Sequence, residues 1–365
     1  MVGLLSRADQ TLGRLDGVAQ TMPNPDLFVA MYVRREAVLS SQIEGTQSTL
    51  EDVLEYELGP EGRDLPQDVE EVVNYVRAMN YGLDRLSTLP LSLRLIREIH
   101  TELLRNVRGS ERQPGEFRTS QNWIGAAGAF LSQATFVPPP PTEMRNALDN
   151  FEKYLHTERE LPVLIHSALA HAQFETIHPF LDGNGRVGRL LITFLLCNRS
   201  VLQRPLLYLS YFFKRNRMEY YDRLMAVREQ GDWEGWIRFF LRGVAETAEE
   251  ATNTARRIVD LREQHRWLVQ QRPFVVAYAP RLVDLLFQHP VVNVNLIKDQ
   301  LGIAFATANK LAEQFQEAGL LEELTGARRN RRYRYTPYLA LFEEPVPETD
   351  QAEPVQITES TERSS

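Results

Sequence analysis

The chain of 365 residues is long enough for two or three domains, and its 43% hydrophobic and 25% charged content is typical of a globular protein. A net charge of −8 excludes a general electrostatic attraction to nucleic acid, so such binding would need a local basic patch. The single cysteine, Cys197, excludes a disulfide framework and favours a reducing, cytoplasmic setting. The start of the chain lacks a secretory layout and no apolar run is long enough to cross a bilayer, so no membrane partner is expected.

Helical spacing of apolar residues dominates the first two thirds of the chain. The stretch PNPDLFVAMYVRREAVLSSQIEG offers Asn24 as an N-cap, Pro25 as the first helical residue and Gly45 as a helix end, which predicts a helix over about 25–45. It belongs to an N-terminal helical region, residues 1–90. Further helices are predicted over 66–86, 91–107, 162–177, 217–229 and 232–270.

Residues 109–141 interrupt this pattern. They are rich in Gly and Pro without a helical period, which predicts a long loop or a small hairpin, and loops of this length are usually functional. The run Pro138–Pro141 is expected to be extended, and Thr142 is expected to cap a helix that ends near His156.

The last part of the chain reads as a separate unit over 275–342, joined to the core by a connecting helix over 246–272. Three short helical segments are followed by two strands around a tip rich in arginine, and Gly302 marks the turn between the second and third helix. This order predicts a winged helix-turn-helix. The acidic tail, residues 343–365, is expected to be disordered.

The stretch HPFLDGNGRVGR, residues 178–189, concentrates the residues that carry chemistry. Gly183, Asn184 and Gly185 precede an apolar helix, so their backbone N–H groups would form an anion site at its N-terminus. Arg186 and Arg189 lie three residues apart on that helix, so both guanidinium groups can reach the same polyphosphate.

Two more side chains complete this candidate site. Asp182 lies beside the expected phosphates and suits Mg²⁺, which prefers one or two carboxylates together with phosphate oxygens. The ordinary pKa of a histidine is about 6.5, which suits His178 to a role as general base. Each piece alone has a simpler interpretation as a structural histidine or a turn, but their concentration in twelve residues favours a catalytic site.

HPFLDGNGRVGR resembles the signature of the Fic (filamentation induced by cAMP) family, HPFx[DE]GNGRxxR, and matches it at every fixed position. The resemblance, which extends over about residues 10–345, implies an all-α fold: a Fic-type helical core over 91–245 with a small β-hairpin flap, followed by the winged helix-turn-helix domain. It also implies a protein adenylyltransferase, an enzyme that transfers AMP from ATP to the Ser, Thr or Tyr hydroxyl of a protein target, the chain itself included, and releases pyrophosphate.

The resemblance assigns a role to each residue of the stretch. His178 would be the base, Asp182 would hold Mg²⁺, Arg186 would contact the β-phosphate and Arg189 the γ-phosphate. The rest of the nucleotide-binding stretch would be formed by Gly183, Asn184, Gly185, Val187 and Gly188.

Two flanking segments resemble other parts of the family. EFRTSQNWIG is similar to the flap that aligns the target segment, with Asn122, Trp123, Ile124 and Gly125 as its contacts, although a hydrophobic plug is the simpler interpretation of Trp123 and Ile124. RNRMEYYDRL is similar to the segment whose first tyrosine, here Tyr220, reaches the adenine; core packing is the alternative.

The upstream stretch SSQIEG resembles the inhibitory motif [ST]xxxE[GN] of many Fic proteins. Ser40 and Glu44 lie four residues apart and so share a helix face. The resemblance implies that Glu44 pairs with Arg189 and prevents ATP from binding productively. In some relatives the same glutamate positions a water that removes AMP, so hydrolysis of modified targets stays an alternative.

The cluster Arg328, Arg329, Arg331, Arg332 and Arg334 at the expected wing is a candidate for contacts with a phosphate backbone. The expected recognition helix, however, carries one lysine and two glutamates. DNA binding and protein docking are therefore both open for this unit, and a DNA-binding regulator with an attached Fic domain is the rival function. A homodimer is considered because relatives often form dimers.

Overall fold

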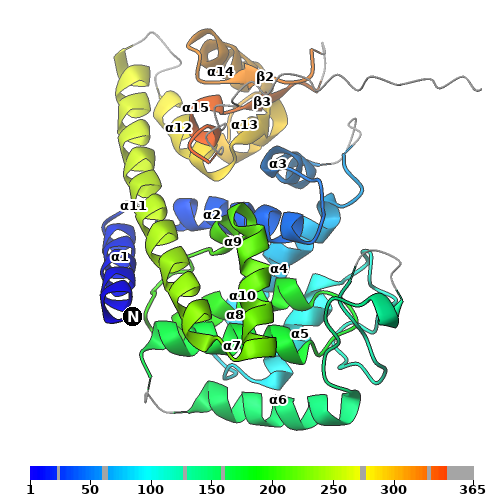
Figure 1. Ribbon diagram of the computed structural model, residues 1–365. Coiled ribbons are helices and arrows are strands. Elements are labelled where there is room, and N and C mark those ends of the chain that lie inside the picture. Colours follow the sequence, from blue (N-terminus) through cyan, green and yellow to red (C-terminus); the bar gives the residue numbers. More distant parts are fainter. Residues whose placement is uncertain are drawn as a thin grey trace, which may run out of the picture.

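A computed structural model of the chain describes residues 1–22, 25–59, 65–125, 130–157, 161–271, 277–326 and 330–342. Helices make up most of the regular structure in these ranges, which confirms the all-α expectation (Figure 1). The expected N-cap Asn24, the wing residues Arg328 and Arg329 and the tail 343–365 lie outside the described residues.

The N-terminal part consists of helices α1 (Val2–Thr21), α2 (Pro25–Ile43), α3 (Leu50–Leu58) and α4 (Val69–Arg85). The helix predicted over 25–45 is confirmed as α2, and Gly45 adopts φ +102° just beyond its end. The sequence patterns did not predict α3, which begins with a capping box in which Thr49 and Asp52 each bond the other's backbone N–H.

The core contains α5 (Leu93–Leu103), α6 (Pro141–His156), α7 (Val163–Ile177), α8 (Asn184–Asn198), α9 (Ser210–Arg215) and α10 (Arg217–Gln230). The apolar helix α8 lies at its centre, against α2, α4, α5 and α7. Gly82 lets α4 cross α8 closely, since a Cβ there would come within 2.4 Å of the Phe194 ring. This packing fixes the N-terminal turn of α8, where the candidate site lies.

Two local expectations need correction. Helix α6 begins at Pro141 with Pro140 as its N-cap, so Thr142 lies inside the first turn and does not cap the helix; proline is well suited to a first helical position because it has no N–H to satisfy. Within the described part of 109–141, the expected hairpin consists of a single bridge between Ile124 and Phe136 and a 3₁₀ turn, η1 (Leu131–Gln133).

The expected division between core and connector at residues 245 and 246 falls inside one continuous helix, α11 (Trp233–Gln271). Figure 1 shows that α1 runs beside α11 and that α11 extends from the core to the C-terminal unit.

The C-terminal unit contains α12 (Ala279–Gln288), β1 (Val291–Asn293), α13 (Val294–Leu301), α14 (Phe305–Glu317), β2 (Glu322–Glu323), β3 (Arg332–Arg334) and α15 (Thr336–Leu339). The two wing strands and the turn at Gly302, with φ +67°, agree with the prediction. The short strand β1 was not predicted; it pairs with β3 and completes an antiparallel sheet in the order β1-β3-β2.

The described wing arginines form ion pairs with carboxylates of the same chain. The buried guanidinium of Arg332 lies 3.4 Å from Glu55, which is fully buried, and donates to the carbonyl of Gly59 at 2.7 Å. Arg334 pairs with Glu51 at 3.1 Å. Because Glu51 and Glu55 both belong to α3, these contacts join the wing to the N-terminal part.

The remaining described members of the cluster are also engaged. Arg331 pairs with Glu313 of α14 at 2.9 Å, and the rings of Tyr333 and Tyr335 are buried. Carboxylates of the same chain therefore pair with Arg331, Arg332 and Arg334, and Arg332 is buried as well. Contact of this cluster with a phosphate backbone stays a prediction.

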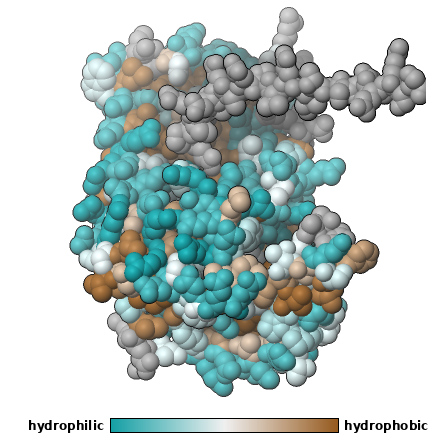
Figure 2. Space-filling view, in the orientation of Figure 1, coloured by the Kyte–Doolittle hydropathy of each residue, from teal (hydrophilic) through white to brown (hydrophobic). Residues whose placement is uncertain are grey.

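The surface is mostly hydrophilic on the face that Figure 2 shows. Hydrophobic colour gathers at its lower right, where Figure 1 places the flap, and the exposed apolar residues of that segment include Trp123, Phe130, Leu131 and Val137. None of the described helices combines the length and the apolar character needed to cross a membrane.

The Arg332–Glu55 pair yields a stability prediction. Arg332→Met leaves a buried carboxylate without its main cation, which costs about 3–5 kcal/mol of unfolding free energy. Adding Glu55→Leu removes the stranded charge and is expected to restore most of the loss, whereas Arg334→Met, at a partly exposed pair, costs under about 1 kcal/mol. Urea unfolding of the full chain measures all three, and equal stability of the single Arg332 variant and the double variant would contradict the assignment.

Candidate functional site

The candidate site lies in the loop between α7 and α8. His178 ends α7 in the left-handed conformation, with φ 48° and ψ 62°, and Gly183, at φ 76°, is the N-cap of α8. The first backbone N–H groups of α8, from Asn184 to Arg186, have no acceptor within the helix by the geometry of a first turn, and they lie at the positive end of its dipole. The loop therefore has the backbone arrangement that the predicted anion site requires, and binding of an anion there stays a prediction.

The Asn184 side chain acts inside the loop. Its oxygen accepts from the Phe180 N–H and its nitrogen donates to the Phe180 carbonyl, both at 2.8 Å. The Phe180 ring is buried and stacks on His100 with a centroid distance of 3.8 Å. Asn184 and Phe180 thus hold the loop in shape.

Burial, aided by the nearby Arg228 guanidinium and opposed by Glu44 and the Glu175 backbone, lowers the pKa of His178 to about 4. This shift favours the neutral imidazole at physiological pH. Its Nδ1 atom is buried and has no hydrogen-bond partner among the residues that the structure describes. A neutral histidine at the mouth of an anion site is equipped to accept a proton.

The contact expected between Glu44 and Arg189 is present. The Glu44 carboxylate accepts from Arg189 Nη2 at 2.7 Å, while Ser40 accepts from Arg189 through both its hydroxyl, at 2.7 Å, and its carbonyl, at 3.0 Å. Burial alone would raise the pKa of Glu44, but the Arg189 charge outweighs it and holds that pKa below its ordinary value. Arg189 is buried, and its Nε and Nη2 atoms donate to Ser40 of α2 and to Glu44 just after α2.

Glu44 also lies against Gly185. A Cβ on Gly185 would come within 2.2 Å of the Glu44 Oε1 atom, so the carboxylate lies directly over the first turn of α8. The absence of a side chain at Gly185 therefore leaves room for Glu44. The same carboxylate thus pairs with Arg189 and lies close to the backbone at the start of α8.

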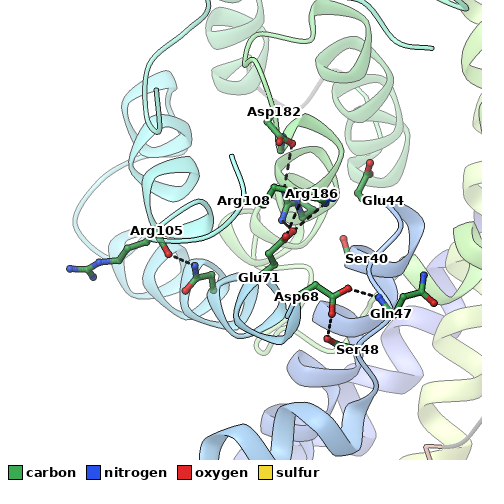
Figure 3. Close-up of polar contacts among 12 residues, drawn as sticks. Ser40, Glu44, Gln47, Ser48, Asp68, Glu71, Arg105, Arg108, Asp182 and Arg186 are labelled. Atoms are coloured by element: carbon green, nitrogen blue, oxygen red, sulfur yellow. Dashed lines mark hydrogen bonds and ion pairs between the residues drawn. The ribbon is translucent and has the colours of Figure 1, made fainter. Parts of the chain in front are cut away.

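Arg186 is held by a second carboxylate, which sequence analysis missed. Its Nη1 lies 3.2 Å from Glu71 of α4, and its Nη2 lies 3.6 Å from Asp182. Arg108, from the segment after α5, shares the same Glu71 at 3.3 Å, and Figure 3 shows both arginines directed at Glu71. A glutamate next to Val72 and Val73 on the buried side of an amphipathic helix was the available signal.

Asp182 fits the expected role at a Mg²⁺ ion in part. Its side chain is 37% exposed, and one oxygen accepts from the Gly183 N–H at 2.6 Å. The described residues contain no cluster of three or more metal-ligating side chains. A single accessible carboxylate suits Mg²⁺ that takes its other ligands from phosphates and water.

The structure places Tyr220 differently from its expected position at the adenine. Its ring is buried, its hydroxyl lies 2.9 Å from His171 Nε2, and it stacks on Phe213. The neighbouring Tyr221 is 38% exposed, and the Glu44 charge helps to raise its pKa after burial. The alternative of core packing therefore describes Tyr220, and Tyr221 is the tyrosine of the pair that faces the site.

The expected flap residues divide into two sets. Asn122 turns inward and donates to the Phe180 carbonyl at 2.9 Å. Ile124 forms the bridge to Phe136, Trp123 is 41% exposed, and Gly125 is also at the surface. The inner end of the flap is thus attached to the catalytic loop, and its outer part is open.

An all-helical core thus places His178 beside the N-terminus of a buried helix. Family models match three parts of the chain. The Fic/DOC family N-terminal model matches residues 2–84, the Fic/DOC family model matches residues 90–196, and a model described as HTH DNA binding domain matches residues 279–334. The chain belongs to the Fic/DOC family and carries a helix-turn-helix unit at its C-terminal side.

Relatives agree with this assignment. Proteins named protein adenylyltransferase Fic from Drosophila grimshawi and Drosophila virilis are each 32% identical to the chain over 214 residues, which is 57% of the chain. The match spans 40% and 39% of those relatives, about two fifths of their length.

Two solved structures share the fold. A Fic family protein from Desulfovibrio desulfuricans G20 has a TM-score of 0.61 at 22% identity, covering 92% of this chain and 95% of that one. A Fic domain containing signaling protein from Bacteroides thetaiotaomicron VPI-5482 has a TM-score of 0.55 at 17% identity, covering 70% and 97%. At these identities the likeness concerns the fold alone.

The Glu44–Arg189 pair predicts a pH-dependent stability. A carboxylate whose folded pKa is depressed contributes stability above its unfolded pKa, and this is lost as the pH falls through the folded pKa. Glu44→Gln is expected to cost about 1–2 kcal/mol at pH 7, since a charge-assisted bond contributes about 1.5–3 kcal/mol and Glu44 is partly exposed. The difference should shrink as the pH falls below the ordinary pKa of a glutamate and through the depressed folded pKa of Glu44. Denaturant unfolding at several pH values, with the exposed Glu246→Gln as control, measures it; a pH-independent difference would contradict the pair.

Proposed function

We propose that the chain is a protein adenylyltransferase that transfers AMP from ATP to a Ser, Thr or Tyr hydroxyl of a protein target and that is inhibited by its own Glu44. The observation that carries the proposal is His178, with its lowered pKa, beside an α8 N-terminus at which Glu44 pairs with Arg189 and lies against Gly185. Relatives named protein adenylyltransferase Fic support the reaction type.

The reaction exchanges one bond for another at the α-phosphorus. His178 accepts the proton of the target hydroxyl as its oxygen bonds to the α-phosphorus, and the bond to the β-phosphate oxygen breaks to release pyrophosphate. The backbone from Gly183 to Arg186 would hold the α- and β-phosphates, and Arg186, already fixed by Glu71, would bind the β-phosphate. Asp182 would hold Mg²⁺, which supplies charge neutralisation on the phosphates when bound.

Inhibition follows from competition for the same groups. While Glu44 pairs with Arg189 and covers Gly185, a triphosphate loses both the distal cation and the backbone next to it. Displacement of Glu44 would free the Arg189 guanidinium and the backbone at Gly185 together. We propose that activation consists of moving this one carboxylate.

A second direction of the reaction has its own support. The depressed pKa keeps Glu44 ionised, and its carboxylate is one-third exposed beside the anion site. It could therefore activate a water that removes AMP from a modified target. The same residues would serve both directions.

For the C-terminal unit, the match to a helix-turn-helix model supports DNA binding, while the pairing of Arg331, Arg332 and Arg334 with carboxylates of the chain favours docking within the protein. We propose docking to α3 as the main role of the described wing residues.

The transfer is tested with ATP labelled on the α-phosphate. We expect label on protein, at a rate raised about 10- to 150-fold in Glu44→Gly because one charge-assisted bond is removed. The Glu44→Gly, His178→Ala double variant should give none. Absence of label in every variant that still binds ATP would overturn self-modification, and release of AMP from a modified protein would support the hydrolytic direction.

The pKa of His178 predicts the pH profile of transfer. Because the base must be neutral and its pKa is held at about 4, the rate of Glu44→Gly at saturating Mg-ATP should stay level from pH 8 to roughly pH 5.5. It should fall only in more acidic solution. An acid limb near pH 6.5, where an unperturbed histidine titrates, would show that His178 is solvated or is not the base.

A further inference from the structure

Arg118 is a buried cation that binds backbone carbonyls. Its side chain is fully buried, and within the ranges that the structure describes no carboxylate pairs with it. Its Nε donates to the His178 carbonyl at 3.0 Å and its Nη2 contacts the Ile177 carbonyl at 3.5 Å. Its Nη1 donates to the Ser120 carbonyl at 3.2 Å, and Nη2 also donates to that of Pro139.

These four carbonyls come from two different places. Ile177 is the last residue of α7 and His178 is the proposed base. Ser120 and Pro139 lie on either side of the Ile124–Phe136 bridge, at the two ends of the flap. The Arg118 backbone N–H adds a bond to the Pro179 carbonyl at 2.9 Å. One side chain therefore attaches both ends of the flap to the catalytic loop.

The arrangement explains the backbone of His178. A non-glycine residue in the left-handed region costs roughly 1–2 kcal/mol, and His178 has φ 48°. This conformation directs its carbonyl to Arg118 while its N–H still bonds the Phe174 carbonyl at 2.9 Å. A buried guanidinium is costly unless its donors are satisfied, so Arg118 favours the one loop geometry that supplies all four carbonyls.

We propose that Arg118 is a positioning residue that holds the flap and His178 in a single geometry, so that a target segment on the flap presents its hydroxyl to the base. The inference rests on the proposed transfer reaction. Arg118 contacts no residue of the phosphate-binding turn at Gly183–Arg186 in the contacts described, so it acts on alignment and not on nucleotide binding.

The variant Arg118→Lys tests whether the fork of donors on Arg118 matters, or only its buried positive charge. Lysine keeps a positive charge and similar length, but its donors radiate from one nitrogen and cannot span carbonyls on both sides. Arg97→Lys is the matched control, because Arg97 also donates to a backbone carbonyl, that of Gly115 at 2.6 Å, but does not reach the catalytic loop. Asn122→Ala is a second test variant, since it breaks the flap's bond to Phe180 without touching a buried charge.

The kinetic test uses the full chain with Glu44→Gly as parent. In Arg118→Lys we expect kcat for AMP transfer to fall about 10²-fold, the scale of a misplacement of about 1 Å, with KM and affinity for ATP unchanged within about twofold. Asn122→Ala should show the same pattern more weakly, and Arg97→Lys should match the parent. A fall in ATP affinity parallel to kcat, or rates within threefold of the parent, would overturn the proposal.

Hydrogen–deuterium exchange gives a readout that does not depend on activity. Arg118→Lys should speed exchange in the flap ends and in the loop 178–183 together, while α6 and α14 stay as in the parent. Faster exchange in the flap alone, or throughout the chain, would overturn the coupling. If the parent transfers no AMP but the two segments loosen together, the proposed function fails while the mechanical attachment stands.

Discussion

The buried charge of Arg189 is the constraint on which the arrangement of the N-terminal helices depends. A guanidinium with almost no contact to water must be paired and hydrogen-bonded, and the partners are Ser40 of α2 and Glu44 just beyond the end of α2. Burial opposes the charge, but Glu44 keeps the pKa of Arg189 above its ordinary value. The catalytic core and the N-terminal region are therefore joined through the cation that a nucleotide would need.

The same face of α2 continues into a polar network that surrounds the site. Glu36 lies one turn before Ser40, is buried, and accepts from the hydroxyls of Tyr75 and Ser210. Burial raises its pKa to about 7, as it does for Glu175 next to Gly188. Glu44 is different: it is the most exposed of the three carboxylates and the one with a depressed pKa. A carboxylate at the rim can be displaced without exposing the buried ones.

The contiguous part of the site could be predicted from the sequence because the residues from His178 to Arg189 share one loop and one helix turn. Glu44 followed from its motif and from its spacing to Ser40. Arg108 and Arg118 could not be found in this way, since their partners lie far along the chain and a charged residue in a loop is usually solvated. For Glu71 the one signal was its place beside Val72 and Val73 on α4, which does not name Arg186 as its partner.

Two sets of residues have contacts that local sequence pattern cannot show. The Tyr220 ring is buried, as the core-packing alternative expected, and the described wing arginines pair with carboxylates of the chain. The apolar surroundings of α7, α9 and α11 enclose Tyr220, and Glu55 requires Arg332. Strand β1 was missed because three residues are too short to show alternation, although its pairing with β3 is what makes the wing a sheet.

The wing contacts connect the C-terminal unit to Glu44 by a short path. Arg332 and Arg334 bind α3, and α3 follows Glu44 through the segment 45–49. Asp68, just before α4, holds that segment by accepting from the Gln47 N–H at 2.6 Å and from the Ser48 hydroxyl (Figure 3). Any partner that required Arg332 would first have to separate it from Glu55, a buried charge that cannot be left unpaired. Such a partner would therefore act on α3, the helix that the segment 45–49 connects to Glu44.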